Sequence, residues 1–173
     1  MDKKPLLGMN KDDDGQIILP DDTYQILVLE RPSNNEVLHE LFAIFELIHQ
    51  FHSDNWPDDS FWYQHLPFSF VSKFSLFYIE DLDYLYENPN GTMHHESWEF
   101  LSWLDALKER GWEWWSGDLN ETNLTMVLLI NDIPERLDAM LEIFRILHLN
   151  VTRHFVNYYS EKEIRHLNLY EYD

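Results

Sequence analysis

The run LTMVLLI, residues 124–130, constrains the fold more than any other stretch of the chain. Its almost continuous apolar character is typical of a strand that is covered on both faces, so we expect a central position in a sheet. Residues 112–116, which also have strand character, come shortly before it. Two strands so close in sequence, with helical patterns elsewhere, predict an α/β or α+β fold in which a single mixed β-sheet is packed with helices.

The remaining elements follow from periodicity, caps and turns. Further strands are predicted at 23–30, 68–74 and 151–159, with either a short helix after Ser160 or a last strand at 167–172. Helices are predicted at 35–52 after a Ser33–Glu36 capping box, at 75–87, from Ser97 to Arg110 before Gly111, and from Asp132–Pro134 to 149 before a left-handed cap at Asn150. Residues 53–67 are predicted to form a loop. A chain of 173 residues is normally one domain, so we expect a polar, partly mobile arm at 1–22 and a single globular domain at 23–173.

Charge limits the classes of partner. There are 32 acidic and 12 basic residues, for a formal net charge of −20. Small domains usually carry a net charge of about 2–8 in magnitude. Such a negative field repels nucleic acid and anionic membranes, whereas it attracts basic proteins and speeds their capture. We therefore expect a basic protein partner, no direct binding to nucleic acid and no membrane association.

The absence of cysteine excludes a disulfide framework and thiolate chemistry, which suits a reducing cytoplasm. The N-terminal residues show no secretory signal, and no apolar run is long enough to span a membrane. These features predict a cytoplasmic protein.

Sequence motifs for catalysis, cofactors and metals are missing. GxSxG, GxGxxG, GxxxxGK[ST] and HExxH do not occur. His49 and His52 have the spacing of two metal ligands on a helix, but neither has a cysteine at ligand spacing. Carboxylates such as Asp58 and Asp59 could act as a glycosidase pair, although nothing marks two of them as partners. We therefore expect no enzyme activity, no cofactor and no metal site.

Three tryptophans within residues 111–122, GWEWWSGDLNET, raise the question of which rings are buried. With the period of a strand, Trp112 and Trp114 share one face, whereas Glu113 and Trp115 share the other. If the first face meets the helices, Trp115 lies outside beside an acid. Exposed tryptophans beside carboxylates are common anchors in protein interfaces.

Acids alternate with aromatic residues in three segments, which together form the predicted partner-binding surface. Carboxylates attract basic side chains, and rigid rings provide anchors that can stack on guanidinium groups. The predicted contact residues are Asp54, Trp56, Asp58, Asp59 and Trp62 in the first segment, Glu80, Asp81, Asp83, Tyr84 and Glu87 in the second, and Glu113, Trp115 and Asp118 in the third.

In charge, size and cysteine content, residues 31–144 resemble the small acidic immunity proteins and antitoxins of bacteria. The resemblance implies a cytoplasmic protein that neutralises a basic toxin, often a nuclease, by occluding its active site or a neighbouring surface. An alternative is an acidic mimic of nucleic acid that inhibits a restriction or CRISPR enzyme. A mimic would carry regular rows of carboxylates, whereas an inhibitor of a basic toxin would gather them in a concave patch.

Overall fold

A single antiparallel sheet forms one side of the molecule in the computed structural model, which describes residues 11–74, 98–157 and 164–167. The order of the strands is β2-β3-β1-β4-β5, and each described pair of neighbours is antiparallel. The predicted single sheet packed with helices is confirmed, and the fold is α+β because the sheet is antiparallel rather than mixed. The strands are β1 (Tyr24–Glu30), β2 (Trp112–Leu119), β3 (Asn123–Ile130), β4 (Val151–Asn157) and β5 (Ile164–Leu167).

The apolar run at 124–130 has the position that its sequence predicts. Its strand, β3, pairs with β2 on one side and with β1 on the other. Leu124, Met126 and Leu128 belong to the core beneath the helices, whereas Val127 is buried on the opposite face. This two-sided burial explains why the run is apolar almost throughout.

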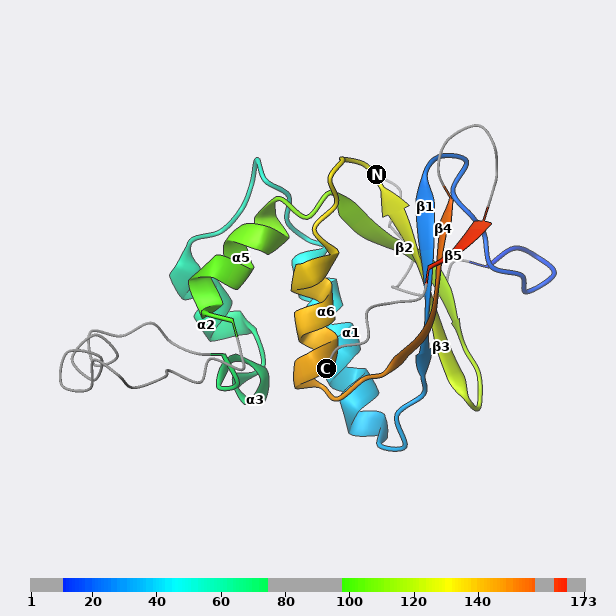
Figure 1. The fold of residues 1–173 in the computed structure, drawn as a ribbon. Coiled ribbons are helices and arrows are strands. Elements are labelled where there is room, and N and C mark those ends of the chain that lie inside the picture. The colour runs from blue at the N-terminus through cyan, green and yellow to red at the C-terminus, as the bar shows by residue number, and fades with distance from the viewer. Residues whose placement is uncertain (1–10, 75–97, 158–163, 168–173) are drawn as a thin grey trace, which may run out of the picture.

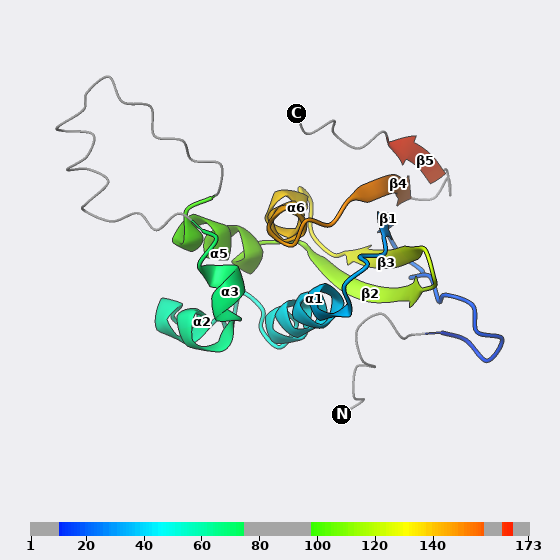
Figure 2. The same cartoon turned by 90° about the horizontal axis from the view of Figure 1, so that it is seen from below.

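The helices form two layers beside the sheet. Figures 1 and 2 show that α1 and α6 cover one face of the sheet, and that α2, α3 and α5 lie farther out. Phe45 of α1 joins the first layer to the sheet, since its ring contacts those of Trp112 and Trp114 at centroid distances of 5.9 and 5.2 Å. The helices are α1 (Asn35–Ile48), α2 (Asp59–His65), α3 (Phe68–Val71), α5 (Phe100–Lys108) and α6 (Leu137–Ile146).

The strand predicted at 68–74 is wrong, because Phe68–Val71 form helix α3. The alternation of Phe68, Phe70 and Phe74 indicated a strand, but Phe70 and Phe74 are also four residues apart, which is helical spacing. Both rings pack on Trp103, at 5.4 and 4.8 Å. Phe68, which a strand would have placed with them, is 85% exposed.

Several predicted element ends are also wrong. The loop at 53–67 contains α2, whose N-cap is Asp58. Helix α1 is capped by Asn34 rather than by Ser33, and α5 by Glu99. Helix α6 begins only after a loop at 131–136. The left-handed residue after it is His148, with φ of 56°, rather than Asn150. The helix predicted at 75–87 lies outside the described residues.

Gly111 is expected to tolerate no side chain. It has φ of +68°, and a Cβ atom there would lie 2.7 Å from the carbonyl oxygen of Asp132. Gly111→Ala should therefore lower the free energy of unfolding by about 2 kcal/mol, measured by urea denaturation. Gly15→Ala is the matched control, because Gly15 also has a positive φ, of +75°, with nothing within 4 Å of the added Cβ. Equal losses in the two variants would contradict the close contact at Gly111.

Candidate protein-binding cleft

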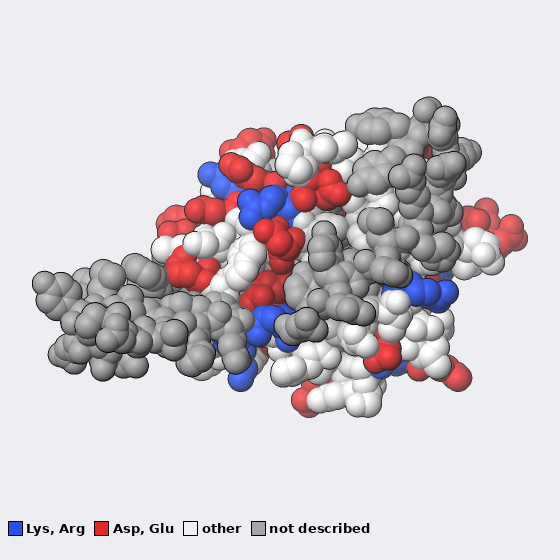
Figure 3. Space-filling view, viewed as in Figure 1, with Lys and Arg blue, Asp and Glu red and all other residues white. Residues whose placement is uncertain are grey.

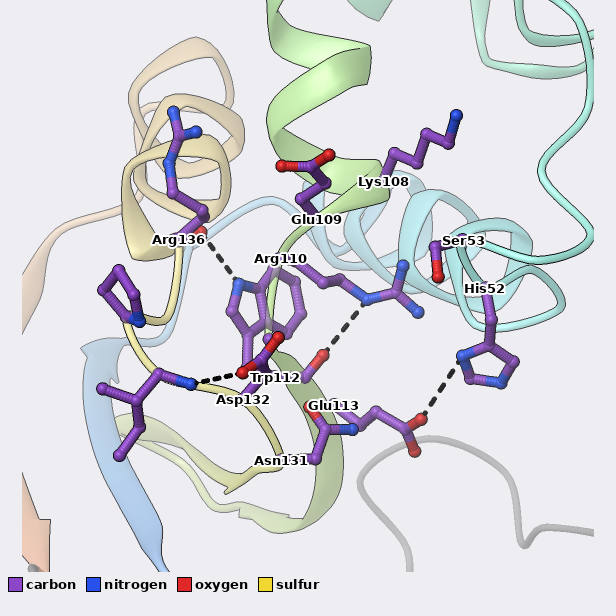
Figure 4. A pocket seen from close by; sticks show the side chains of 13 residues that line it. His52, Ser53, Lys108, Glu109, Arg110, Trp112, Glu113, Asn131, Asp132 and Arg136 are labelled. Carbon is purple, nitrogen blue, oxygen red and sulfur yellow. Dashed lines mark hydrogen bonds and ion pairs between the residues drawn. The ribbon is translucent and has the colours of Figure 1, made fainter.

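A cleft of about 760 Å³ opens where two helix ends, the first residues of β2 and the β3–α6 loop meet (Figure 4). The end of α5 lies in its wall, since the last helical residue, Lys108, and the C-cap, Glu109, line it. Three carboxylates line the cleft, those of Glu109, Glu113 and Asp132. The other lining residues are His52, Ser53, Lys108, Arg110, Gly111, Trp112, Asn131, Ile133, Pro134 and Arg136.

Arg110 holds three walls of the cleft together. Its guanidinium group is buried and donates to three backbone carbonyl oxygens: Phe51 after α1 at 3.0 Å, Leu107 of α5 at 3.2 Å and Trp112 of β2 at 3.1 Å. A cation is favourable here because helix C-terminal ends carry unpaired carbonyls and partial negative charge. Its position fixes the ends of α1 and α5 relative to β2.

The β3–α6 loop is fixed to the same place. The backbone N–H groups of Asn131 and Asp132 both donate to Gly111 O, at 3.0 and 3.2 Å. The indole Nε1 of Trp112 donates to Arg136 O at 2.9 Å, and the N–H of Arg136 donates to Arg110 O at 2.7 Å. The loop that carries Asp132 is therefore held by backbone bonds rather than by ion pairs.

Two opposing effects act on the pKa of Arg110. Burial lowers the pKa of Arg110, and the nearby carboxylate of Glu113 raises it. Glu113 also lies 3.6 Å from Nδ1 of His52, and its side chain is only 14% exposed. Glu113 therefore offsets the buried guanidinium within the cleft, while Glu109 and Asp132 are exposed at its rim.

The tryptophans of β2 are placed as the sequence predicts, with one irregularity. Trp112 and Trp114 are buried, and Trp115 is 36% exposed. The register shifts between Trp114, which is opposite Leu128, and Ser116, which is opposite Val127, so Trp115 is the extra residue of a β-bulge. The Trp115 ring is therefore exposed at the bulge.

The first predicted segment is only partly exposed. Asp54, Asp58 and Asp59 are exposed, and Trp56 is half-buried against Trp62, with ring centroids 4.5 Å apart. Trp62 is fully buried, so its predicted role as a partner contact is wrong.

Asp58 has a structural role as well. It caps α2, and the hydrogen bond from the Phe61 N–H, followed by that from the Ser60 hydroxyl, lowers the pKa of Asp58. The exposed carboxylate of Asp58 is therefore still accessible to a partner, while its hydrogen bonds stabilise the first turn of α2.

The chain just before the first segment contacts the third, since Nδ1 of His52 lies 3.6 Å from the Glu113 carboxylate and Asp54 follows His52 by two residues. Asp118 lies farther along β2 and pairs with Lys11. The residues of the second segment, Glu80, Asp81, Asp83, Tyr84 and Glu87, lie outside the described residues.

Sequence reasoning missed the central part of the cleft. Arg110 and Asp132 were read only as the ends of helices, and Glu109 was not singled out. Arg110-Gly111 after an amphipathic helix could have suggested a cationic helix end, since arginine near a C-terminus can bond the last carbonyls.

His49 and His52 do not share a ligand position. The His49 ring accepts a hydrogen bond from the Trp114 N–H at Nε2, 2.7 Å away, and its Nδ1 lies 2.9 Å from Phe45 O. His52 faces Glu113. Within the described ranges, no group of three histidines or acids is arranged to hold a metal ion.

No family model, no curated protein and no solved structure matches this chain. In the described ranges, the helices lack the combined length and apolar character needed to cross a bilayer.

Proposed function

We propose that this chain is an immunity or antitoxin protein that binds a basic protein toxin, for which a nuclease is the leading candidate, and occludes its active or substrate-binding surface. The supporting observation is the cleft, which gathers Glu109, Glu113 and Asp132 in one concave place, beside Lys108, Arg110 and Arg136, on a chain of net charge −20. Figure 3 shows acidic side chains over the region of α5, α6 and the loop that joins β3 to α6, with basic side chains among them.

Binding proceeds in two physical stages. The net negative field attracts a basic protein from a distance and orients it. A lysine or arginine of the toxin then enters the cleft, where Glu109 and Asp132 at its rim pair with it. The hydrogen bonds of Arg110 keep the walls in place, so little ordering accompanies binding.

The concave arrangement favours the toxin inhibitor over a mimic of nucleic acid. Glu109, Glu113 and Asp132 come from a helix end, a strand and a loop that converge on one cleft. A row of phosphates would require acids spaced along an open surface. In this proposal the chain acts by binding rather than by catalysis, and it acts in the cytoplasm, for which the lack of cysteine is the support.

A triple variant of the cleft tests the proposal. Glu109→Gln, Glu113→Gln and Asp132→Asn together should reduce affinity for the cognate toxin by about a hundredfold and abolish protection of cells that express it. The toxin to test first is the product of the neighbouring gene, with protection measured by growth and affinity by calorimetry.

The matched control is a triple variant with the same chemistry at exposed acids outside the cleft: Asp21→Asn, Glu46→Gln and Glu121→Gln. Both variants remove three negative charges, so they weaken long-range attraction equally. The control should lose less than about threefold in affinity. Equal losses in both variants would show that the cleft is not the contact site, and an unprotected wild-type strain would refute inhibition of that toxin.

A further inference from the structure

A short N-terminal segment lies against β2 near the bulge. Residues 11–18, here called the strap, form a turn in which the Asp12 carboxylate accepts from the N–H groups of Asp14 and Gln16, at 3.0 and 2.8 Å. Lys11 forms an ion pair with Asp118 of β2. The Ser116 hydroxyl donates to Ile18 O at 2.8 Å. Figures 1 and 2 show the turn of the strap projecting outward beyond the strands.

The surface next to the strap has the features of a contact for a cation. Asp118 is partly exposed, and it lies on the same side of β2 as Ser116, which is itself fully buried. Trp115, the bulged residue, is partly exposed beside them in sequence. A carboxylate near an exposed indole can pair with a lysine or arginine whose stem or guanidinium lies on the ring.

We infer that the strap covers part of the toxin-binding surface, with Lys11 at the position on Asp118 that a lysine or arginine of the toxin takes in the complex. The inference rests on the proposed function and extends it from the cleft, at Glu113, along the same strand to Asp118. The strap then acts as an intramolecular competitor that a basic partner displaces.

The contacts of the strap fit this role because they are easily broken. The side chains of Lys11 and Asp118 remain 34% and 30% exposed, and exposed ion pairs contribute little net stability. An attached ammonium group still competes, since tethering gives it a high effective concentration at the carboxylate. A toxin that presents several cations outcompetes a single lysine through its additional contacts.

Binding of a fluorescein-labelled decalysine peptide at low salt, measured by fluorescence anisotropy, tests the inference. Lys11→Gln removes the competing charge and should tighten binding about three- to fivefold relative to the wild type. Lys73→Gln is the control, because it removes one positive charge from another exposed lysine, after α3. It should tighten binding by less than about 1.5-fold, the effect of net charge alone.

The double variant Lys11→Gln with Asp118→Asn should show none of the gain, because the uncovered carboxylate is then absent. Equal affinities of Lys11→Gln and Lys73→Gln, or a gain that persists in the double variant, would overturn the strap inference. If the cleft triple variant still loses protection in that case, the proposed function stands without the strap. If the wild type gives no protection, inhibition of that toxin is refuted, whatever the strap variants show with the peptide.

Discussion

Replacing Arg110 with methionine is expected to lower the free energy of unfolding by about 3–4 kcal/mol. The arginine is 4% exposed, and its three nitrogens donate to carbonyl oxygens of three different segments. Methionine keeps much of the length of the stem but leaves buried carbonyls unpaired, and it removes the contact of the guanidinium with the Trp112 ring, 5.8 Å from its centroid. Urea denaturation followed by tryptophan fluorescence measures the loss.

Lys108→Met is the matched control for this prediction. Lys108 lines the same cleft and carries the same charge, but its side chain is exposed. Its replacement should change the free energy of unfolding by less than about 0.5 kcal/mol. If the two variants lost stability equally, the net charge of the cleft, and not the carbonyl bonds of Arg110, would be responsible.

Stability should also fall by about 3 kcal/mol between pH 6.5 and pH 4, because of His154 on β4. Burial lowers the pKa of His154 to about 4, from 6.5 in the unfolded chain. Its Nε2 lies 2.6 Å from Gln25 Oε1, and Gln25 Nε2 donates in turn to Glu135. The Nδ1 atom of His154 has no hydrogen-bond partner among the described residues, so a proton there is costly.

The direction of this change in stability with pH follows from proton binding by His154. Above pH 6.5, His154 is neutral in both states and its effect on stability is constant. As the pH falls through 6.5, the unfolded chain takes up a proton that the folded chain refuses until about pH 4, so acid favours unfolding. The loss is complete below the folded pKa.

A histidine variant isolates this contribution from that of the acids. His154→Gln should flatten the stability curve between pH 6.5 and 4, whereas His39→Gln, at an exposed histidine of α1, should leave its slope as in the wild type. Urea midpoints at pH 7.5, 6, 5 and 4 provide the comparison. A wild-type slope in His154→Gln would assign the acid sensitivity to carboxylates instead.

Local sequence patterns determined the central strands and the larger helices because those elements carry their own signals. The apolar run at 124–130 required cover on both faces, and the amphipathic pattern of α5 required one buried side. The short helix α3 was predicted wrongly, because so short an element fits the spacing of a strand as well as that of a helix. Only the packing of Phe70 and Phe74 on Trp103 decides in favour of the helix.

The candidate surface was predictable only in part. Composition indicated acids beside exposed rings, and Trp115 and Asp54 are exposed. It could not distinguish Trp62, which is fully buried, from Trp115, because burial of a ring depends on which distant residues pack over it. Composition also could not predict that Glu109, Glu113 and Asp132 lie in one cleft, because their convergence depends on the path of three separate segments.

The sequence by itself determined the charge, the kinds of most of the longer elements and the inward and outward rings of β2. Only the tertiary structure decided which acidic residues lie close together. A buried guanidinium that bonds carbonyls from α1, α5 and β2 draws these segments to one point, and the carboxylates near that point form the cleft. Hydrogen bonds between residues as distant as Phe51 and Arg110 have no local signature, because they exist only once the chain has folded.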